Sequence, residues 1–141
     1  MVAKTLEDEG HGIPVDAAPT VLVVEDDRLV MMVISEALAD DHFRVLAAPD
    51  AVAARRILES DAVDVLFTDI DLGPGPSGLV LAREARRLCP GLAVVYASGG
   101  RPSVPKDLAV PGATFVPKPY RQAEVCDLLS RIARRPGSVS M

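Results

Sequence analysis

Five side chains that can do chemistry stand directly after, or at the end of, short apolar runs of this sequence. They are three carboxylates, one hydroxyl and one ammonium: Glu25, Asp26, Asp69, Ser98 and Lys118. Carboxylates that come together repel one another, so such a group is stable only with a bound cation or with raised pKa values. Oxygen ligands without His or Cys favour Mg²⁺ over zinc or copper. The residue types therefore predict a Mg²⁺ site beside a nucleophilic carboxylate.

The same residues are suited to phosphoryl transfer. A carboxylate such as Asp69 can accept a phosphoryl group and form an aspartyl phosphate. The protein then mainly positions the group and neutralises its charge. Mg²⁺ and Lys118 would neutralise the phosphoryl oxygens, and the Ser98 hydroxyl offers a further hydrogen bond. Gly99 and Gly100 remove side-chain bulk, which lets the backbone approach.

The apolar runs themselves are typical of strands buried on both faces, because they are short and rich in β-branched residues. They are Val21–Val24, Phe43–Ala47, Val63–Thr68, Leu92–Ala97 and Ala113–Val116. Apolar residues make up 49% of the chain and aromatic residues only 4%, which suits a sheet covered by helices better than a barrel.

Segments with helical spacing of apolar residues alternate with these runs. They are Leu29–Ala39, Ala51–Leu58, Gly78–Leu88 and Tyr120–Arg135. Asp27, Asp50 and Ser77 precede the first three and are predicted N-caps. The alternation predicts a five-stranded parallel α/β sheet with right-handed crossovers. Ligands of such sheets bind outside the carboxyl ends of the strands, which is where the five chemical side chains would meet.

The slot for the fourth helix is irregular. Pro102, Pro105 and Pro111 crowd residues 101–111, and proline is poorly tolerated beyond the first turn of a helix. We therefore expect a short or distorted helix there.

Length and charge limit the remaining options. The 141 residues suffice for one domain, which we place at residues 20–135, with a flexible leader (1–19), a flexible tail (136–141) and no output domain. The net charge of −5 argues against direct nucleic-acid binding. No apolar stretch approaches the roughly 20 residues of a membrane span, and no signal peptide is expected, so a cytoplasmic location is the default. Cys89 and Cys126 are expected to be reduced thiols.

Several of these strings resemble the receiver domain of two-component response regulators. Val21–Asp27 resembles its opening, Asp69 closes the third strand, Ser98 closes the fourth, and Phe115–Pro119 closes the fifth. The resemblance covers Thr20–Arg135. It implies the flavodoxin-like (βα)5 fold with strand order 2-1-3-4-5.

The resemblance also implies roles for the acidic residues. Asp69 would be the phosphoacceptor. Asp26 would bind Mg²⁺ directly, Glu25 would act through water, and Asp71 would contribute its backbone carbonyl. The phosphoryl group would come from a sensor histidine kinase or a histidine phosphotransfer protein. The chain would be a phosphoprotein rather than an enzyme, with at most slow autodephosphorylation.

The switching residues implied by the resemblance are Ser98, Lys118 and Phe115. The Ser98 hydroxyl would move onto the phosphoryl group, Lys118 would pair with it, and the Phe115 ring would follow the position of Ser98. The output would pass to a downstream protein target, and a homodimer stays open. The bond between Lys118 and Pro119 is a candidate for the cis isomer, which an X–Pro bond adopts at modest cost.

The sequence departs from the family pattern in two further places. The loop Gly73–Gly78 is one residue longer than the commonest form. Met31 and Met32 occupy a helix that normally faces the kinase and often carries a basic residue there. Their apolar character is explained equally well by burial and by a hydrophobic docking surface.

Two alternatives belong to other functional classes. Phe67–Leu72 resembles the DxDx motif of haloacid-dehalogenase phosphatases, with Asp69 as nucleophile and Asp71 as acid/base. Those enzymes carry the motif on the first strand of their core and a second acidic pair downstream, whereas here the acidic pair lies upstream. The second alternative is a pseudo-receiver that acts only as an interaction module and has no need of the acidic residues.

Overall fold

A computed structural model describes residues 18–134, which form one α/β domain. The elements follow the order β1 (Thr20–Val24), α1 (Arg28–Asp40), β2 (Arg44–Ala48), α2 (Ala51–Ser60), β3 (Val65–Asp69), α3 (Gly78–Leu88), β4 (Ala93–Ser98), β5 (Thr114–Pro117) and α4 (Gln122–Arg134). The predicted tail and all but the last two residues of the predicted leader lie outside the described residues.

All five strands are parallel and lie in the order β2-β1-β3-β4-β5. The predicted fold class and strand order are therefore confirmed. The order reverses between β1 and β3, because the chain first adds β2 on one side of β1 and then continues on the other. This switch point is where an open parallel sheet forms its ligand-binding crevice.

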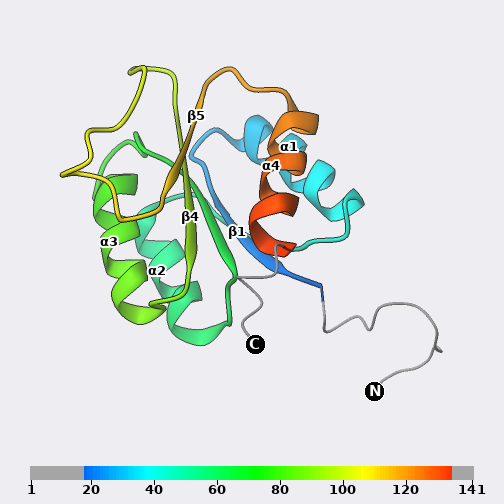
Figure 1. The fold of residues 1–141 in the computed structure, drawn as a ribbon, viewed down its shortest axis with the longest axis horizontal. Coiled ribbons are helices and arrows are strands. Elements are labelled where there is room, and N and C mark those ends of the chain that lie inside the picture. Colours follow the sequence, from blue (N-terminus) through cyan, green and yellow to red (C-terminus); the bar gives the residue numbers. More distant parts are fainter. Residues whose placement is uncertain (1–17, 135–141) are drawn as a thin grey trace.

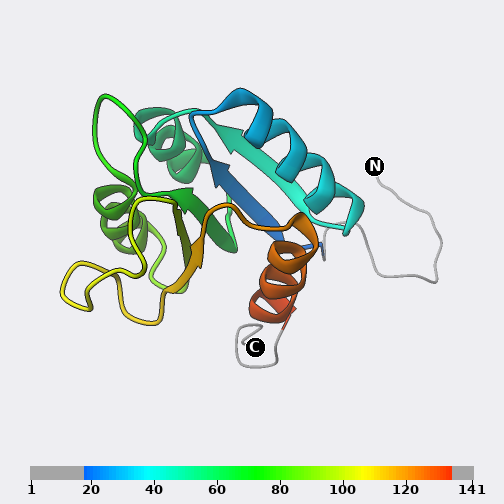
Figure 2. The same ribbon diagram turned by 90° about the horizontal axis from the view of Figure 1, so that it is seen from above.

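Helices cover both faces of the sheet (Figures 1 and 2). One core cluster contains Leu66, Tyr96 and Val110 and includes the inner residues of α2 and α3. The other contains Val23, Ile34 and Leu129 and includes the inner residues of α1 and α4. Since both faces are buried, β1, β3 and β4 are apolar at nearly every position, as the sequence predicted.

The predicted caps begin their helices as expected. The Asp27 carboxylate accepts hydrogen bonds from the backbone N–H groups of Leu29 and Val30. Asp50 and Ser77 do the same for α2 and α3. These side chains bond N–H groups that have no partner within the helix. Strands β2 to β5 end one residue after the predicted apolar runs, so Asp69 and Ser98 are the last residues of β3 and β4, as the sequence predicted.

Between β4 and β5 no helix forms. Residues 101–113, called here the 101–113 segment, contain one hydrogen-bonded turn, in which Leu108 and Ala109 donate to the Pro105 carbonyl. The prolines lack the N–H groups that a longer helix would need. We predicted a short or distorted helix here, and the structure has only a single turn. The described residues therefore form four helices.

None of the four helices in residues 18–134 combines the length and the apolar character needed to cross a membrane.

Candidate functional site

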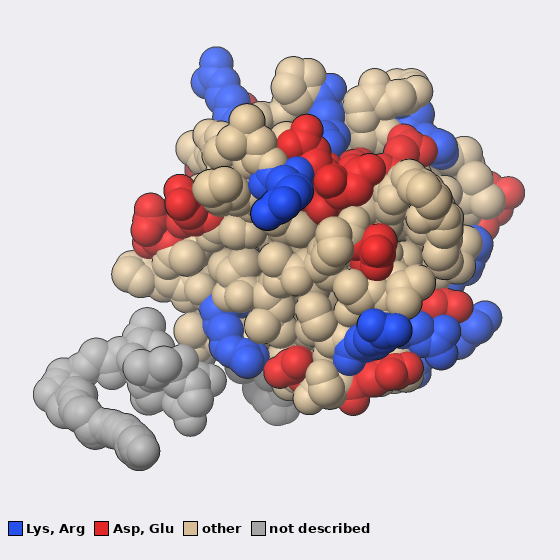
Figure 3. Space-filling model, turned by 180° about the vertical axis from the view of Figure 1, so that it is seen from behind, with Lys and Arg blue, Asp and Glu red and all other residues tan. Residues whose placement is uncertain are grey.

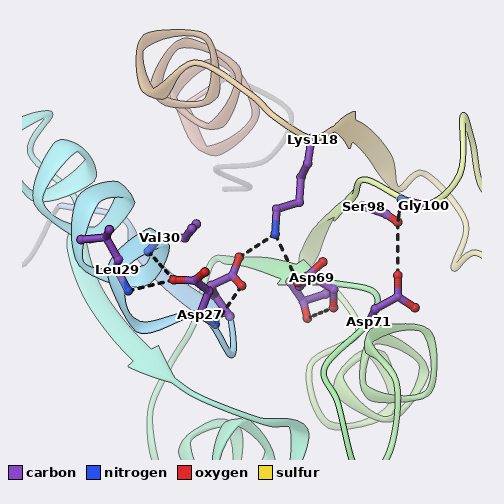
Figure 4. Close-up of polar contacts among 10 residues, drawn as sticks. Asp27, Leu29, Val30, Asp69, Asp71, Ser98, Gly100 and Lys118 are labelled. Atoms are coloured by element: carbon purple, nitrogen blue, oxygen red, sulfur yellow. Dashed lines mark hydrogen bonds and ion pairs between the residues drawn. The ribbon is translucent and has the colours of Figure 1, made fainter.

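The side chains predicted to do chemistry come together at the carboxyl ends of β1, β3, β4 and β5, and Figure 4 labels three of them, Asp69, Ser98 and Lys118. Backbone hydrogen bonds continue the sheet just past the strand ends. Glu25 N–H donates to Ala48 O over 3.2 Å, and Lys118 N–H donates to Ser98 O over 2.9 Å. These hydrogen bonds fix the backbone of Glu25 and Lys118, the residues that follow β1 and β5.

Three carboxylates form the acidic part of the site. One oxygen each of Glu25, Asp26 and Asp69 lies within 4.8 Å of the others. Glu25 is 5% and Asp69 8% exposed, whereas Asp26 is exposed. Asp27, the acid next to Asp26 in the sequence, serves another purpose: it caps α1, and its N–H donates to Glu25 Oε2 over 3.1 Å. That bond orients the Glu25 carboxylate.

The Lys118 ammonium bridges two of these carboxylates. Its Nζ lies 3.0 Å from Glu25 Oε1 and 3.3 Å from Asp69 Oδ2. Two buried carboxylates this close together need a positive charge beside them, and the Lys118 ammonium supplies one. The peptide bond between Lys118 and Pro119 is cis, as the sequence suggested.

The site raises the pKa of Asp69 to about 6. Burial is the main cause, because it disfavours the charged carboxylate, and the negative charge of Glu25 adds to the effect. The Lys118 ammonium acts in the opposite direction and compensates only in part. For Lys118 itself, burial lowers the pKa, but the hydrogen bond to Glu25 and the charges of Asp69 and Glu25 outweigh it and raise the pKa. The carboxylates thus hold more negative charge than one ammonium neutralises.

Ser98 lies on the other side of Asp69, toward Asp71. Its buried hydroxyl is 3.4 Å from Asp71 Oδ2 and accepts a hydrogen bond from Gly100 N–H over 3.2 Å. The Asp71 carboxylate is exposed and stands apart from the three clustered carboxylates. Its predicted contact with a metal runs through the main chain and stays a prediction.

Phe115 pairs in register with Tyr96 of β4 and packs against the core on the side of α2 and α3. It is half-buried, on the strand at the edge of the sheet. Its role as the switch aromatic stays a prediction.

Three residues near the site were not singled out from the sequence. Gly78 starts α3 so close to the acid strand that a Cβ would lie 2.1 Å from the Asp69 carbonyl oxygen. Tyr120 packs against Phe67 with ring centroids 5.7 Å apart, and burial and the Glu25 charge raise its pKa to about 12. Tyr96 is fully buried. Their neighbours in the sequence are ordinary loop, cap and strand residues, so nothing in the sequence indicated that these three residues lie near the site.

The donor set fits Mg²⁺. Mg²⁺ binds oxygen at about 2.1 Å, so ligands on opposite sides of the ion lie about 4.2 Å apart. The carboxylate oxygens of Glu25, Asp26 and Asp69 are within 4.8 Å of one another, so small side-chain movements bring them into range. The three charges also exceed what Lys118 compensates. At Gly73 the backbone has φ +74°, and a Cβ there would lie 3.4 Å from Asp26 Oδ2, so glycine keeps the approach to Asp26 open.

Comparison with known proteins identifies the class. The family model of the response regulator receiver domain matches residues 21–130. The chain therefore belongs to the response-regulator receiver family, whose members accept phosphoryl groups and bind Mg²⁺ in an acidic pocket.

Individual proteins similar to this chain are response regulators or receiver proteins. Protein PetR of Rhodobacter capsulatus is 28% identical over 118 residues, which cover 83% of this chain and 49% of PetR. Response regulator MprA of Mycobacterium ulcerans is 30% identical over 82% of this chain and 50% of MprA. The chain thus spans about half the length of these curated relatives. A response regulator receiver protein from Sinorhizobium medicae superposes with a TM-score of 0.74 at 28% identity, covering 83% of this chain and 93% of that one.

The family and the fold both disfavour the phosphatase alternative. Asp69 ends β3, the third strand along the chain, and the other clustered acids follow β1. Haloacid-dehalogenase enzymes carry their paired aspartates on the first strand. The string Phe67–Leu72 therefore stands at a different place in this fold from the motif that it resembles.

Proposed function

We propose that this chain is a phosphoaccepting receiver in which Asp69 takes a phosphoryl group from a phosphohistidine donor. The observation that carries the proposal is a cluster of three carboxylates at the switch point of the sheet, two of which, Glu25 and Asp69, pair with Lys118. A pseudo-receiver has no need to keep a nucleophilic carboxylate, a metal-binding set and a neutralising cation together.

Each step assigns work to residues of the chain. The phosphorus–nitrogen bond of the donor breaks as a phosphorus–oxygen bond to an Asp69 carboxylate oxygen forms, and the departing imidazole takes a proton from solvent. Lys118 Nζ, 3.3 Å from Asp69 Oδ2, can pair with an oxygen of the new phosphoryl group. Ser98 would turn its hydroxyl from Asp71 toward the same group. The Phe115 ring would then move into the space that the Ser98 hydroxyl has left.

Mg²⁺ would be held by Asp26 and Asp69 directly, by Glu25 through water and by the main-chain carbonyl of Asp71. When bound, the ion supplies positive charge that neutralises the phosphoryl oxygens. The Asp69 carboxylate must be ionised to attack. A nearby cation favours the ionised form and offsets the burial that raises its pKa.

The direct test uses a small phosphodonor. The purified chain is incubated with acetyl phosphate and Mg²⁺, and its intact mass is measured. We expect one phosphoryl group per chain in the parent, none in Asp69→Asn, and full labelling in Asp107→Asn, an exposed carboxylate on the 101–113 segment. Catalytic turnover of a small phosphate ester without stable labelling would instead support a phosphatase.

The partner class rests on a separate feature, the outer surface of α1. Leu29 is 66% and Met32 54% exposed, and Val33 is also exposed, while Met31 packs partly against the core. Of the two explanations given for the methionines, burial therefore fits Met31 and an exposed apolar surface fits Met32. Figure 3 shows the molecule from behind, where an area of uncharged side chains is bordered by acidic and basic ones. We propose that a helical phosphohistidine protein docks on this side of α1, next to the acidic site.

A comparison of two phosphodonors tests the docking proposal. Met32→Lys should slow phosphotransfer from the histidine protein that labels the parent fastest, and it should leave labelling by acetyl phosphate unchanged. Val52→Lys is the matched control, because Val52 is 52% exposed on α2 instead of α1. Equal transfer rates for parent and Met32→Lys would refute docking on α1.

A further inference from the structure

Two hydroxyl groups of β4 hold the two ends of the 101–113 segment. Ser98 Oγ accepts the Gly100 N–H, just before the segment, over 3.2 Å. The phenol oxygen of Tyr96 accepts the Val110 N–H, near its other end, over 3.1 Å. Both side chains come from the same face of β4, since they are two residues apart in a strand. The first hydroxyl belongs to the proposed switch, and the second has no role so far.

The segment also packs partly against the core through Val104, Ala109 and Ala113. Its described backbone hydrogen bonds are local: Leu108 and Ala109 donate to Pro105, and Ala113 donates to Val110. Residues 105–108 are exposed. Val110 is different, because it is only 6% exposed and belongs to the core cluster. Loss of the partner of a buried N–H costs the full desolvation of that group.

The Tyr96 side chain is held in one position by the core around it. It is 1% exposed and lies in the middle of the core. In the sheet it pairs with Thr68 on one side and with the edge residue Phe115 on the other. A side chain packed on all sides keeps its rotamer, whereas Phe115 is only half-buried.

We propose that Tyr96 is a positioning residue of the switch, fixing the Val110 end of the 101–113 segment so that phosphorylation frees only the Gly100 end. This inference rests on the proposed function. When Ser98 turns to the phosphoryl group, Gly100 N–H loses its acceptor and the first half of the segment is released. The hydrogen bond from Val110 to Tyr96 persists and serves as the pivot.

Amide exchange and chemical shifts, measured by NMR on the whole chain, test the inference. In the absence of any phosphoryl mimic, Tyr96→Phe should speed exchange of the Val110 amide by about tenfold or more. Tyr120→Phe, which removes the chain's other phenol, should leave Val110 as in the parent. Ser98→Ala should perturb the Gly100 amide and leave Val110 protected. Unchanged Val110 exchange in Tyr96→Phe would overturn the inference, whether or not the chain is phosphorylated in nature.

The second readout uses beryllofluoride with Mg²⁺, a mimic of the bound phosphoryl group. In the parent we expect amide shifts to change at Gly100, Ser103 and Val104 while Val110 stays protected. In Tyr96→Phe the response should extend to Val110, which a merely structural role of the tyrosine would not produce. Loss of Val110 protection in the parent on adding the mimic would overturn the pivot, and this measurement needs no variant to fold.

Discussion

Removing the charge of Asp69 should stabilise the metal-free chain at neutral pH. The carboxylate is 8% exposed, and burial together with Glu25 raises its pKa from 3.8 to about 6. A raised pKa means that the folded state binds the proton more tightly than the unfolded state does. Ionisation of Asp69 therefore costs folding free energy, and this cost is absent at low pH and grows as the pH rises from about 4 to about 6.

The magnitude follows from the shift. A change of about two pKa units, at about 1.4 kcal/mol each, sets a ceiling of about 3 kcal/mol at pH 7. Asn has nearly the shape of Asp and no charge, so Asp69→Asn should unfold at higher denaturant than the parent, by about 1–3 kcal/mol. The ion pair with Lys118 is lost in the variant, but it is already included in the net pKa shift.

Urea unfolding of both chains between pH 4 and pH 8, with chelator and then with Mg²⁺, is the assay. With chelator, the advantage of Asp69→Asn should disappear as the pH falls to 4. With Mg²⁺ the parent should recover stability at pH 7, because an ion that binds only the folded state stabilises it. A parent that is more stable than Asp69→Asn at pH 7 without metal would refute the claim that burial and the Glu25 charge together disfavour the ionised Asp69 carboxylate.

Three further substitutions probe the other parts of the site. Asp26→Ala should weaken Mg²⁺ binding by about tenfold or more in titration calorimetry, because a carboxylate of the cluster is removed; unchanged affinity would exclude Asp26 as a ligand. Lys118→Met should slow labelling of Asp69 by acetyl phosphate on the order of tenfold or more, followed by intact mass, since no ammonium then neutralises the phosphoryl oxygens. Gly78→Ala should lower the free energy of unfolding by about 1–3 kcal/mol, because its Cβ meets backbone atoms of Asp69, and Gly91→Ala, with no atom within 4 Å of its Cβ, is the control that should not.

The sequence predicted the sheet and the acidic site because both depend on local patterns. Buried parallel strands are apolar at every position, and the ends of such strands must meet at one edge of the sheet. The rest depends on contacts between distant residues. The bridge from Lys118 to Glu25 joins residues 93 apart, and the bond from Val110 to Tyr96 joins a loop to a buried strand. The prolines indicated an irregular fourth helix, but not that the segment bonds Tyr96 through Val110 and packs on the core.

Gly78 shows the same limit at the smallest scale. Its sequence neighbours mark only the start of a helix, and the reason for glycine appears when α3 is seen against the backbone of Asp69 and Ile70. A requirement for close approach between two segments leaves no periodic pattern in a single sequence.

The residue that carries the phosphoryl group is the most direct test of this account. After incubation with acetyl phosphate and Mg²⁺, borohydride reduction converts a phosphorylated aspartate to homoserine, and peptide mapping locates the converted residue. The account predicts conversion at Asp69 alone. Conversion at Asp26, at Asp71 or at no residue would contradict it.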